Sequence, residues 1–221
     1  MKEIRKKELL AGIVLLAAFA LWTELIRHID IQNAGPNGTE IGFATVNVWF
    51  HRLIGVHLLV YTITDWLGLV PIIICMCFGT LGLAQLVKRR SLLKVDFDIL
   101  LLGAYYVVVI LGYLLFEMVP INYRPILIDG NLEASYPSST TLLVLTVMPT
   151  LKYQSDRRIA NPVARKAVAV FVIVFTAFMV IGRLIAGVHW ITDIIGSVFL
   201  SSGLFMIYRF MADTPVKGKH I

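Results

Sequence analysis

The chain has 221 residues, of which 58% are hydrophobic and only 15% are charged, and its mean hydropathy is +0.80. A soluble domain carries about 25% charged residues, so this composition excludes a soluble globular domain and indicates one integral membrane domain over residues 1–221. The net charge of +6 does not indicate a nucleic-acid partner, because the basic residues fall mostly in short clusters between apolar runs.

The sequence predicts membrane-spanning helices at residues 9–26, 67–87, 97–119, 137–153, 167–185 and 190–210. The first run could instead belong to a signal peptide, since Ala18-Phe19-Ala20 resembles a cleavage site. The apolar run continues past Ala20, however, which favours an uncleaved span. The fourth run is short for about 20 residues of bilayer, so it either extends through Lys152 or lies deep in the bundle.

Residues 43–66, between the first two spans, are too polar to cross the membrane and too apolar for a free loop. We expect one or two helices lying in the membrane interface here, with Trp49, Tyr61 and Trp66 at the level of the lipid headgroups. The predicted fold is therefore all-α: a six-transmembrane-helix bundle with an interfacial amphipathic helix between spans one and two.

Basic residues gather at the N-terminus, in residues 88–94, in residues 152–166 and in the tail from Lys217. If there are six spans, all four clusters lie on one side, which the positive-inside rule identifies as the cytoplasm. We therefore expect a multi-pass protein of the cell membrane with cytoplasmic N- and C-termini. The loops that share the outer face are then residues 28–66, 120–137 and 184–189.

Three candidate site residues lie where the fifth predicted span ends and the sixth begins. Arg183, His189 and Asp193 place a cation, an imidazole and a carboxylate at the edge of the membrane, where charge is costly. His189 and Asp193 are four apart, so on a helix they would share a face. The carboxylate would then fix the imidazole tautomer, and Arg183 could hold an anion beside the ring.

A second set of candidates precedes and opens the fourth span. Arg124 could grip an anion through its guanidinium fork, and Pro137 suits a first helical position. The residues after it would present free backbone N–H groups and the positive end of a helix dipole, a combination that binds phosphate. Their hydroxyl groups, on Ser138, Ser139 and Thr140, would add donors.

These motifs, in this order, resemble those of the type 2 phosphatidic acid phosphatase superfamily, which also includes vanadium haloperoxidases. The resemblance covers residues 45–210 and rests on Arg124-Pro125, Pro137-Ser138 and Arg183-x5-His189-x3-Asp193. It implies that the arginines hold phosphate with help from Ser138, that His189 forms a phosphohistidine, and that Asp193 orients it. No metal or other cofactor is needed for such chemistry, because the arginines and the helix end neutralise the phosphate charge.

The resemblance implies a lipid phosphatase acting at the outer membrane face on a phosphomonoester or diphosphate lipid, such as phosphatidic acid, phosphatidylglycerol phosphate or a polyprenyl diphosphate. The chain departs from the family pattern at three positions: Glu117 replaces a lysine, Thr140 replaces the second-motif histidine, and Gly182 replaces a serine. The missing histidine is the residue taken to protonate the leaving group.

Several explanations of the missing acid remain open. A diphosphate needs little protonation of its leaving group, or Glu117, His51 or His57 supplies the proton, or the protein binds phospholipid without turnover. A phosphotransferase using the same phosphohistidine is a further alternative. A transporter is weaker, because it would need charged groups near the bilayer midplane. The plainer interpretations are a structural His189–Asp193 pair, arginines that anchor span ends, and serines that only cap a helix.

Overall fold

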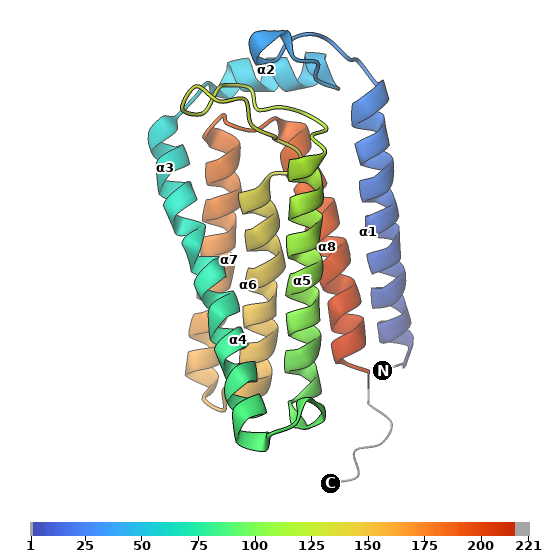
Figure 1. The fold of residues 1–221 in the computed structure, drawn as a ribbon, viewed down its shortest axis with the longest axis vertical. Coiled ribbons are helices and arrows are strands. Elements are labelled where there is room, and N and C mark those ends of the chain that lie inside the picture. The colour runs from blue at the N-terminus through green and yellow to red at the C-terminus, as the bar shows by residue number, and fades with distance from the viewer. Residues whose placement is uncertain (1, 215–221) are drawn as a thin grey trace.

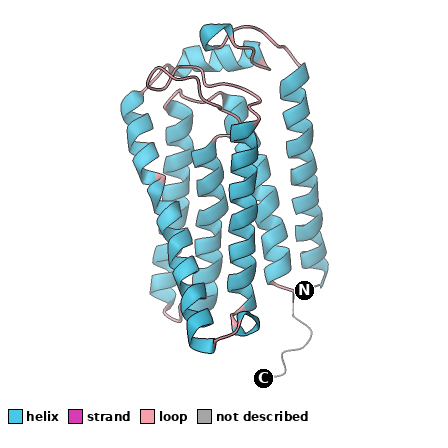
Figure 2. Cartoon of the chain, in the orientation of Figure 1, coloured by secondary structure: helices cyan, strands magenta, loops and turns pink. Residues whose placement is uncertain are grey.

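The computed structural model describes residues 2–214, and this part of the chain is a bundle of α-helices without a β-sheet (Figures 1 and 2). The helices are α1 (Lys2–His28), α2 (Ala44–Ile54), α3 (Leu58–Leu67), α4 (Leu69–Arg89), α5 (Phe97–Met118), α6 (Ser139–Arg158), α7 (Pro162–Ile185) and α8 (Ile191–Ala212). The all-α prediction is confirmed. The basic tail from Lys217 lies outside the described residues.

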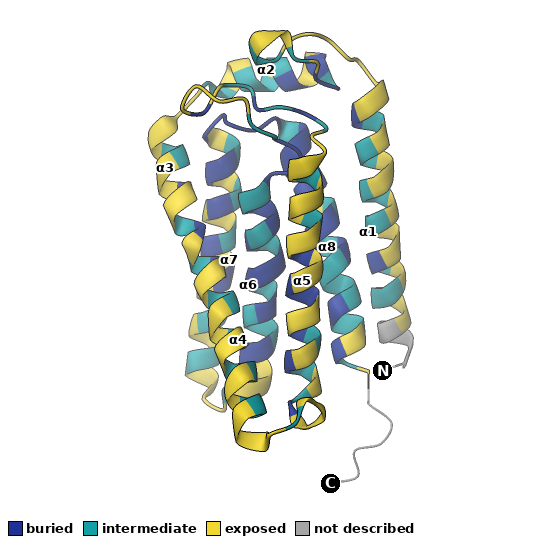
Figure 3. Cartoon of the chain, viewed as in Figure 1, coloured by how far each residue is buried: buried dark blue, intermediate teal, exposed yellow. Residues whose placement is uncertain are grey.

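Five helical segments among the described residues are long and apolar enough to cross a membrane: Lys6–His28, Leu58–Arg89, Phe97–Met118, Pro162–Ile185 and Ile191–Ala212. They correspond to five of the six predicted spans. The remaining one, α6, is too polar to qualify by composition, yet it runs beside α5, α7 and α8 in the bundle (Figure 1). Much of its surface is buried (Figure 3).

The polar side chains of α6 are accommodated by hydrogen bonds to neighbouring helices. The hydroxyl groups of Thr150 and Tyr106 lie 2.7 Å apart, and the Gln154 amide donates to the Tyr208 hydroxyl at 2.9 Å. A buried polar group without a partner costs about 1–3 kcal/mol, so these contacts allow a polar helix to lie inside the bundle. The apolar side of α6 packs against α7, where Met179 is fully buried.

The expectation for residues 43–66 is wrong in its second half. Helix α2 crosses the end of the bundle (Figure 1), but α3 continues directly into α4 through Gly68, so the candidate span begins at Leu58. The threonines that made this segment look interfacial are tolerated because their hydroxyls donate to the preceding helical turn. Thr64, for example, donates to the carbonyl of Val60 at 2.8 Å.

The connections α1–α3, α5–α6 and α7–α8 gather at one end of the bundle, where α2 also lies (Figure 1). The α7–α8 loop is fixed there by close contact with the α2–α3 junction: the His57 amide donates to the carbonyl of Ala186 at 3.1 Å. Gly187 has φ +68°, and a Cβ at that position would lie 2.0 Å from the carbonyl oxygen of Gly55. Only glycine lets the two backbones lie this close together, and this contact positions the residues that follow Gly187.

Candidate active site

Arg183, in the last turn of α7, is almost completely buried, with 1% of its surface exposed. Its Nη2 lies 3.4 Å from Nε2 of His189, and its Nη1 lies 3.5 Å from the Thr64 hydroxyl and 3.7 Å from the Asp65 carboxylate. The guanidinium carbon is 5.0 Å from the centre of the Tyr61 ring. Because Asp65 is largely exposed, its ion pair neutralises little of the buried charge.

Arg124 reaches the same place from the α5–α6 loop. Its backbone amide donates to the Glu133 carbonyl at 3.1 Å, which closes a short hairpin-like segment. Its Nε lies 3.1 Å from the Glu133 carboxylate, and its guanidinium carbon is 5.9 Å from the centre of the Tyr61 ring. The guanidinium groups of Arg124 and Arg183 therefore share one aromatic ring, although they come from distant parts of the chain.

Both guanidinium groups have donors without acceptors. Nε and Nη1 of Arg124 and Nε of Arg183 are buried and have no hydrogen-bond partner within residues 2–214; the Glu133 contact is an ion pair without hydrogen-bond geometry. Leaving charged donors buried and unpaired is expensive, and placing two such cations on one ring adds repulsion. A tetrahedral oxyanion between them would satisfy both groups.

His189 lies in the α7–α8 loop, outside both neighbouring candidate spans, and only 4% of it is exposed. Burial, followed by the charges of Arg124 and Arg183, holds the pKa of this imidazole well below its usual range. The ring is therefore neutral near pH 7, the state required of a nitrogen nucleophile. An anion bound to the arginines would offset their charge and favour the positive ring that forms after attack.

The expectation that His189 and Asp193 share a helical face is wrong. Helix α8 begins at Ile191, so His189 precedes it, and Nδ1 of His189 lies 3.7 Å from Oδ2 of Asp193, too far for a hydrogen bond. Ser135 lies between them. Its Oγ is 3.2 Å from Nδ1 and donates a hydrogen bond to Oδ2, and its carbonyl oxygen is also 3.2 Å from Nδ1.

The start of α6 also differs from the expectation. The helix begins at Ser139 and Ser138 is its N-cap residue, so Pro137 precedes the helix. The Tyr136–Pro137 peptide bond is cis. The Ser138 hydroxyl does not cap the helix; it donates to the Thr141 hydroxyl at 3.0 Å. The first-turn amides thus have no side-chain cap, which leaves them available to another acceptor.

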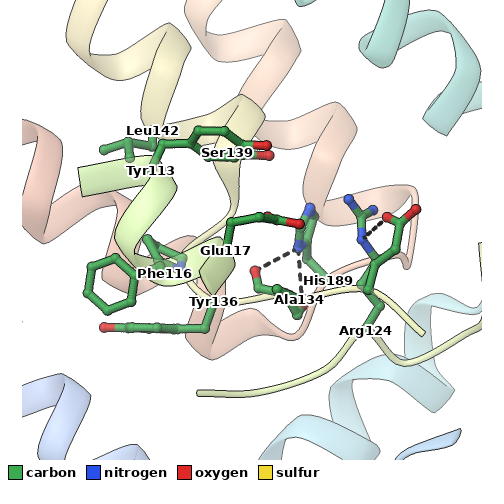
Figure 4. Close-up of a pocket in the computed structure, with 12 residues that line it drawn as sticks. Tyr113, Phe116, Glu117, Arg124, Ala134, Tyr136, Ser139, Leu142 and His189 are labelled. Carbon is green, nitrogen blue, oxygen red and sulfur yellow. Dashed lines mark hydrogen bonds and ion pairs between the residues drawn. The ribbon is translucent and has the colours of Figure 1, made fainter. Parts of the chain in front are cut away.

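A polar cavity of about 260 Å³ connects the Arg124 guanidinium, the His189 imidazole and the start of α6 (Figure 4). Its lining includes Arg124, Glu133, Ser135, Ser139 and His189. Among the predicted phosphate-binding hydroxyls only that of Ser139 belongs to this lining. Ser138 and Thr140 do not, since neighbouring residues in a first helical turn face different directions.

Of the three alternative proton donors, only Glu117 lines this cavity. It extends from the last turn of α5, and in Figure 4 its carboxyl group is directed toward His189. The two other histidines lie elsewhere: Nε2 of His51 is 3.1 Å from the carbonyl of Gly187, and Nε2 of His57 is 2.9 Å from the carbonyl of Ile54.

A second, mostly apolar cavity of about 530 Å³ lies between α4, α5 and α6. It shares Tyr113, Ser139 and Leu142 with the polar cavity, so the two adjoin. Thr140 lines this apolar cavity. The residue that replaces the family's second-motif histidine therefore faces the apolar space and not the imidazole of His189.

The residues that sequence reasoning missed are Ser135, Glu133 and Tyr61. Ser135 and Glu133 lie in a polar loop where no spacing rule distinguishes a functional side chain from a solvated one. Tyr61 was assigned to the headgroup region, and its contacts with both arginines depend on packing between α3, α7 and the α5–α6 loop. A hydroxyl close to the Pro137-Ser138 motif was the one signal for Ser135.

The chain is similar to known proteins in its fold and in its sequence. A solved structure, a transmembrane PAP2-type phosphatidylglycerolphosphate phosphatase from Bacillus subtilis, is similar with a TM-score of 0.61 and 17% sequence identity, over 93% of this chain and 98% of that one. At this identity the similarity concerns the fold. No curated protein sequence gives a significant match. The family model of the PAP2 superfamily matches residues 95–215, more than half of the chain, and the protein therefore belongs to the PAP2 superfamily.

Proposed function

We propose that this protein is a membrane lipid phosphatase that hydrolyses a phosphomonoester or diphosphate lipid through a phosphohistidine intermediate. The observation that carries the proposal is the pair of buried guanidinium groups, with unpaired N–H donors, beside a neutral imidazole. Membership of the PAP2 superfamily and the fold of a PAP2-type phosphatase support the same reaction class.

In the first step, Nε2 of His189 attacks phosphorus, and the bond from phosphorus to the leaving oxygen breaks. Arg183 is suited to hold a phosphoryl oxygen during this step, because its Nη2 lies 3.4 Å from the attacking nitrogen. Arg124 and the first amides of α6 would hold other phosphoryl oxygens. Such preorganised donors typically contribute about 10²- to 10³-fold each to the rate.

The leaving oxygen must receive a proton, and we assign the role of proton donor to Glu117. It lines the polar cavity with His189, whereas Thr140 lines the apolar one. In the second step the Glu117 carboxylate would take a proton from water, which attacks phosphorus, breaks the N–P bond and releases phosphate and neutral His189. General acid–base catalysis of this kind is typically worth about 10²- to 10⁴-fold.

The lipid part of the substrate would occupy the apolar cavity between α4, α5 and α6. This cavity adjoins the polar one at Tyr113, Ser139 and Leu142, so a single molecule could place its phosphate beside His189 and a hydrocarbon chain between the helices. A water-soluble phosphate ester would leave the apolar space empty, which favours a lipid.

We further propose that α6 is the sixth membrane crossing and that the site faces outward. The start of α1, the α4–α5 and α6–α7 connections and the end of α8 lie at the end of the bundle opposite the site (Figure 1). These segments carry the basic clusters Lys88–Arg90 and Arg157–Arg158. The positive-inside rule then assigns that end, with the chain termini, to the cytoplasm of a cell-membrane protein.

The test is phosphate release by purified protein from phosphatidic acid, phosphatidylglycerol phosphate and a polyprenyl diphosphate. His189→Ala should abolish release and the acid-labile phosphoenzyme, whereas His57→Ala, at a histidine outside the cavity, should retain both. Equal release by wild type and His189→Ala would refute the proposed mechanism.

Glu117→Gln separates the remaining alternatives. As the acid, Glu117 should matter more for a phosphomonoester than for a diphosphate, whose phosphate leaving group needs less protonation. An equal loss of activity on both substrates would exclude Glu117 as the acid.

The departures at positions 117 and 140 favour a second candidate, a phospholipid-binding protein without turnover. Binding of these lipids by wild type, with no phosphate release or transfer to an alcohol, would establish it.

A further inference from the structure

We propose that Ser135 is the positioning residue through which Asp193 acts on His189. The inference rests on the proposed phosphohistidine reaction and adds a link that the sequence motifs do not contain. All three side chains are buried, with 1%, 4% and 0% exposure for Ser135, His189 and Asp193. The carboxylate does not reach the ring, since Oδ2 and Nδ1 are 3.7 Å apart. The Ser135 hydroxyl lies within hydrogen-bond distance of both.

The main chain of Ser135 fixes the tautomer of His189. A carbonyl oxygen can only accept a hydrogen bond, and that of Ser135 lies 3.2 Å from Nδ1. Nδ1 therefore carries the proton, and the lone pair of the ring is on Nε2, which faces Nη2 of Arg183 at 3.4 Å. Selection of the nucleophilic nitrogen thus needs no direct contact with Asp193.

The side chain of Ser135 supplies the connection to the carboxylate. Its Oγ–H donates to Oδ2 of Asp193, so its lone pairs are directed toward the Nδ1–H group of His189 at 3.2 Å. The carboxylate is itself oriented by the Trp190 amide, which donates to the same oxygen at 2.8 Å. When attack on phosphorus makes the ring positive, the polarised hydroxyl stabilises that charge.

Ser135 is held in place by the loop that carries Arg124. Its amide donates to the carbonyl of Asn122 at 2.9 Å, two residues before that arginine. The same short segment therefore fixes an anion-binding group and the partner of the nucleophile.

A double-mutant cycle tests the link. Ser135→Ala should lower kcat by about 10- to 100-fold, the effect of losing one hydrogen bond to a charged group, and should leave KM within about twofold. Asp193→Asn should lower kcat at least as much. Because both act through one contact, the double variant should lie within about threefold of Asp193→Asn alone. Ser201→Ala, at a buried serine whose hydroxyl donates to the carbonyl of Ser197, is the matched control and should retain full turnover.

Multiplicative losses in the double variant, or full turnover of Ser135→Ala, would overturn the inference. If Asp193→Asn does not fold, Ser135→Thr tests the inference, because threonine keeps the hydroxyl and should recover turnover. A Ser135→Thr variant with wild-type Tm that is as slow as Ser135→Ala would overturn the inference. Activity of His189→Ala would refute the phosphohistidine reaction instead, so the two failures are distinguishable.

Discussion

Replacement of Arg183 by Met should stabilise the anion-free protein while it abolishes turnover. The substitution removes a buried guanidinium whose Nε has no acceptor and which shares the Tyr61 ring with Arg124. An unpaired buried donor costs about 1–3 kcal/mol. The losses are of similar size: about 1 kcal/mol or less for the ion pair with exposed Asp65, about 1–2 kcal/mol for the cation–π contact of this buried group, and little for the long hydrogen bonds to Thr64 and His189, so the repulsion between the two arginines decides the sign. With the repulsion from Arg124 also removed, we expect a net gain of about 1 kcal/mol.

Thermal unfolding in detergent with and without orthovanadate measures both effects. For a chain of this size a gain of about 1 kcal/mol raises Tm by about 2–4 °C. Vanadate at about 100 times its Kd should stabilise the wild type by about 2.7 kcal/mol and should leave Arg183→Met unchanged. Arg209→Met, which removes an ion pair with Glu8 at the other end of the bundle, is the control and should keep the vanadate shift. A variant less stable than wild type without anion, or an equal vanadate shift, would refute the reasoning.

Three further predictions concern the cavities and the nucleophile. Because the pKa of His189 lies well below its usual range, kcat/KM of the wild type should stay constant as pH falls through about 6.5. Arg124→Gln removes one cause of that low pKa, so the fall of kcat/KM at acid pH should begin at a higher pH in this variant. An unchanged pH profile would contradict the assignment of His189 as the titrating nucleophile. Thr140→His should not raise kcat, since position 140 faces the apolar cavity; a gain of tenfold or more in phosphate release would show that the lost acid belongs there. Val109→Trp, which fills the apolar cavity, should raise KM for a long-chain lipid phosphate and spare a short-chain one, and equal effects on both would place the hydrocarbon chain elsewhere.

The helices could be predicted because apolar length is a local property of the sequence. Four predicted spans coincide with candidate spans to within about five residues, and the second starts earlier, at Leu58. The error there came from judging Thr62 and Thr64 as solvent-seeking, when their hydroxyls bond to carbonyls of their own helix. The polarity of α6 was visible in the sequence, but the Tyr106–Thr150 and Gln154–Tyr208 contacts that accommodate it depend on which helices are neighbours.

The site was only partly accessible from the sequence for the same reason. Spacing brought attention to Arg183, His189 and Asp193, and the structure places these side chains together with Arg124. Spacing also suggested a direct contact between the imidazole and the carboxylate, because residues four apart share a face where both lie on a helix. The helix begins two residues after His189, and the gap is occupied by Ser135 from another loop. A residue that acts by filling a gap between two others leaves no periodic signal in the chain.

Two of the three departures from the family pattern, at positions 117 and 140, can be understood as one change in the site. In the family pattern, the residue at position 117 is a lysine, which adds positive charge to the cradle, and the residue at position 140 is a histidine, which is taken to protonate the leaving group. Here the carboxyl group of Glu117 is in the polar cavity, and Thr140 lies in the apolar one. A carboxyl group in place of a cation would weaken phosphate binding, and the cavity for the lipid chain would compensate through burial of hydrocarbon.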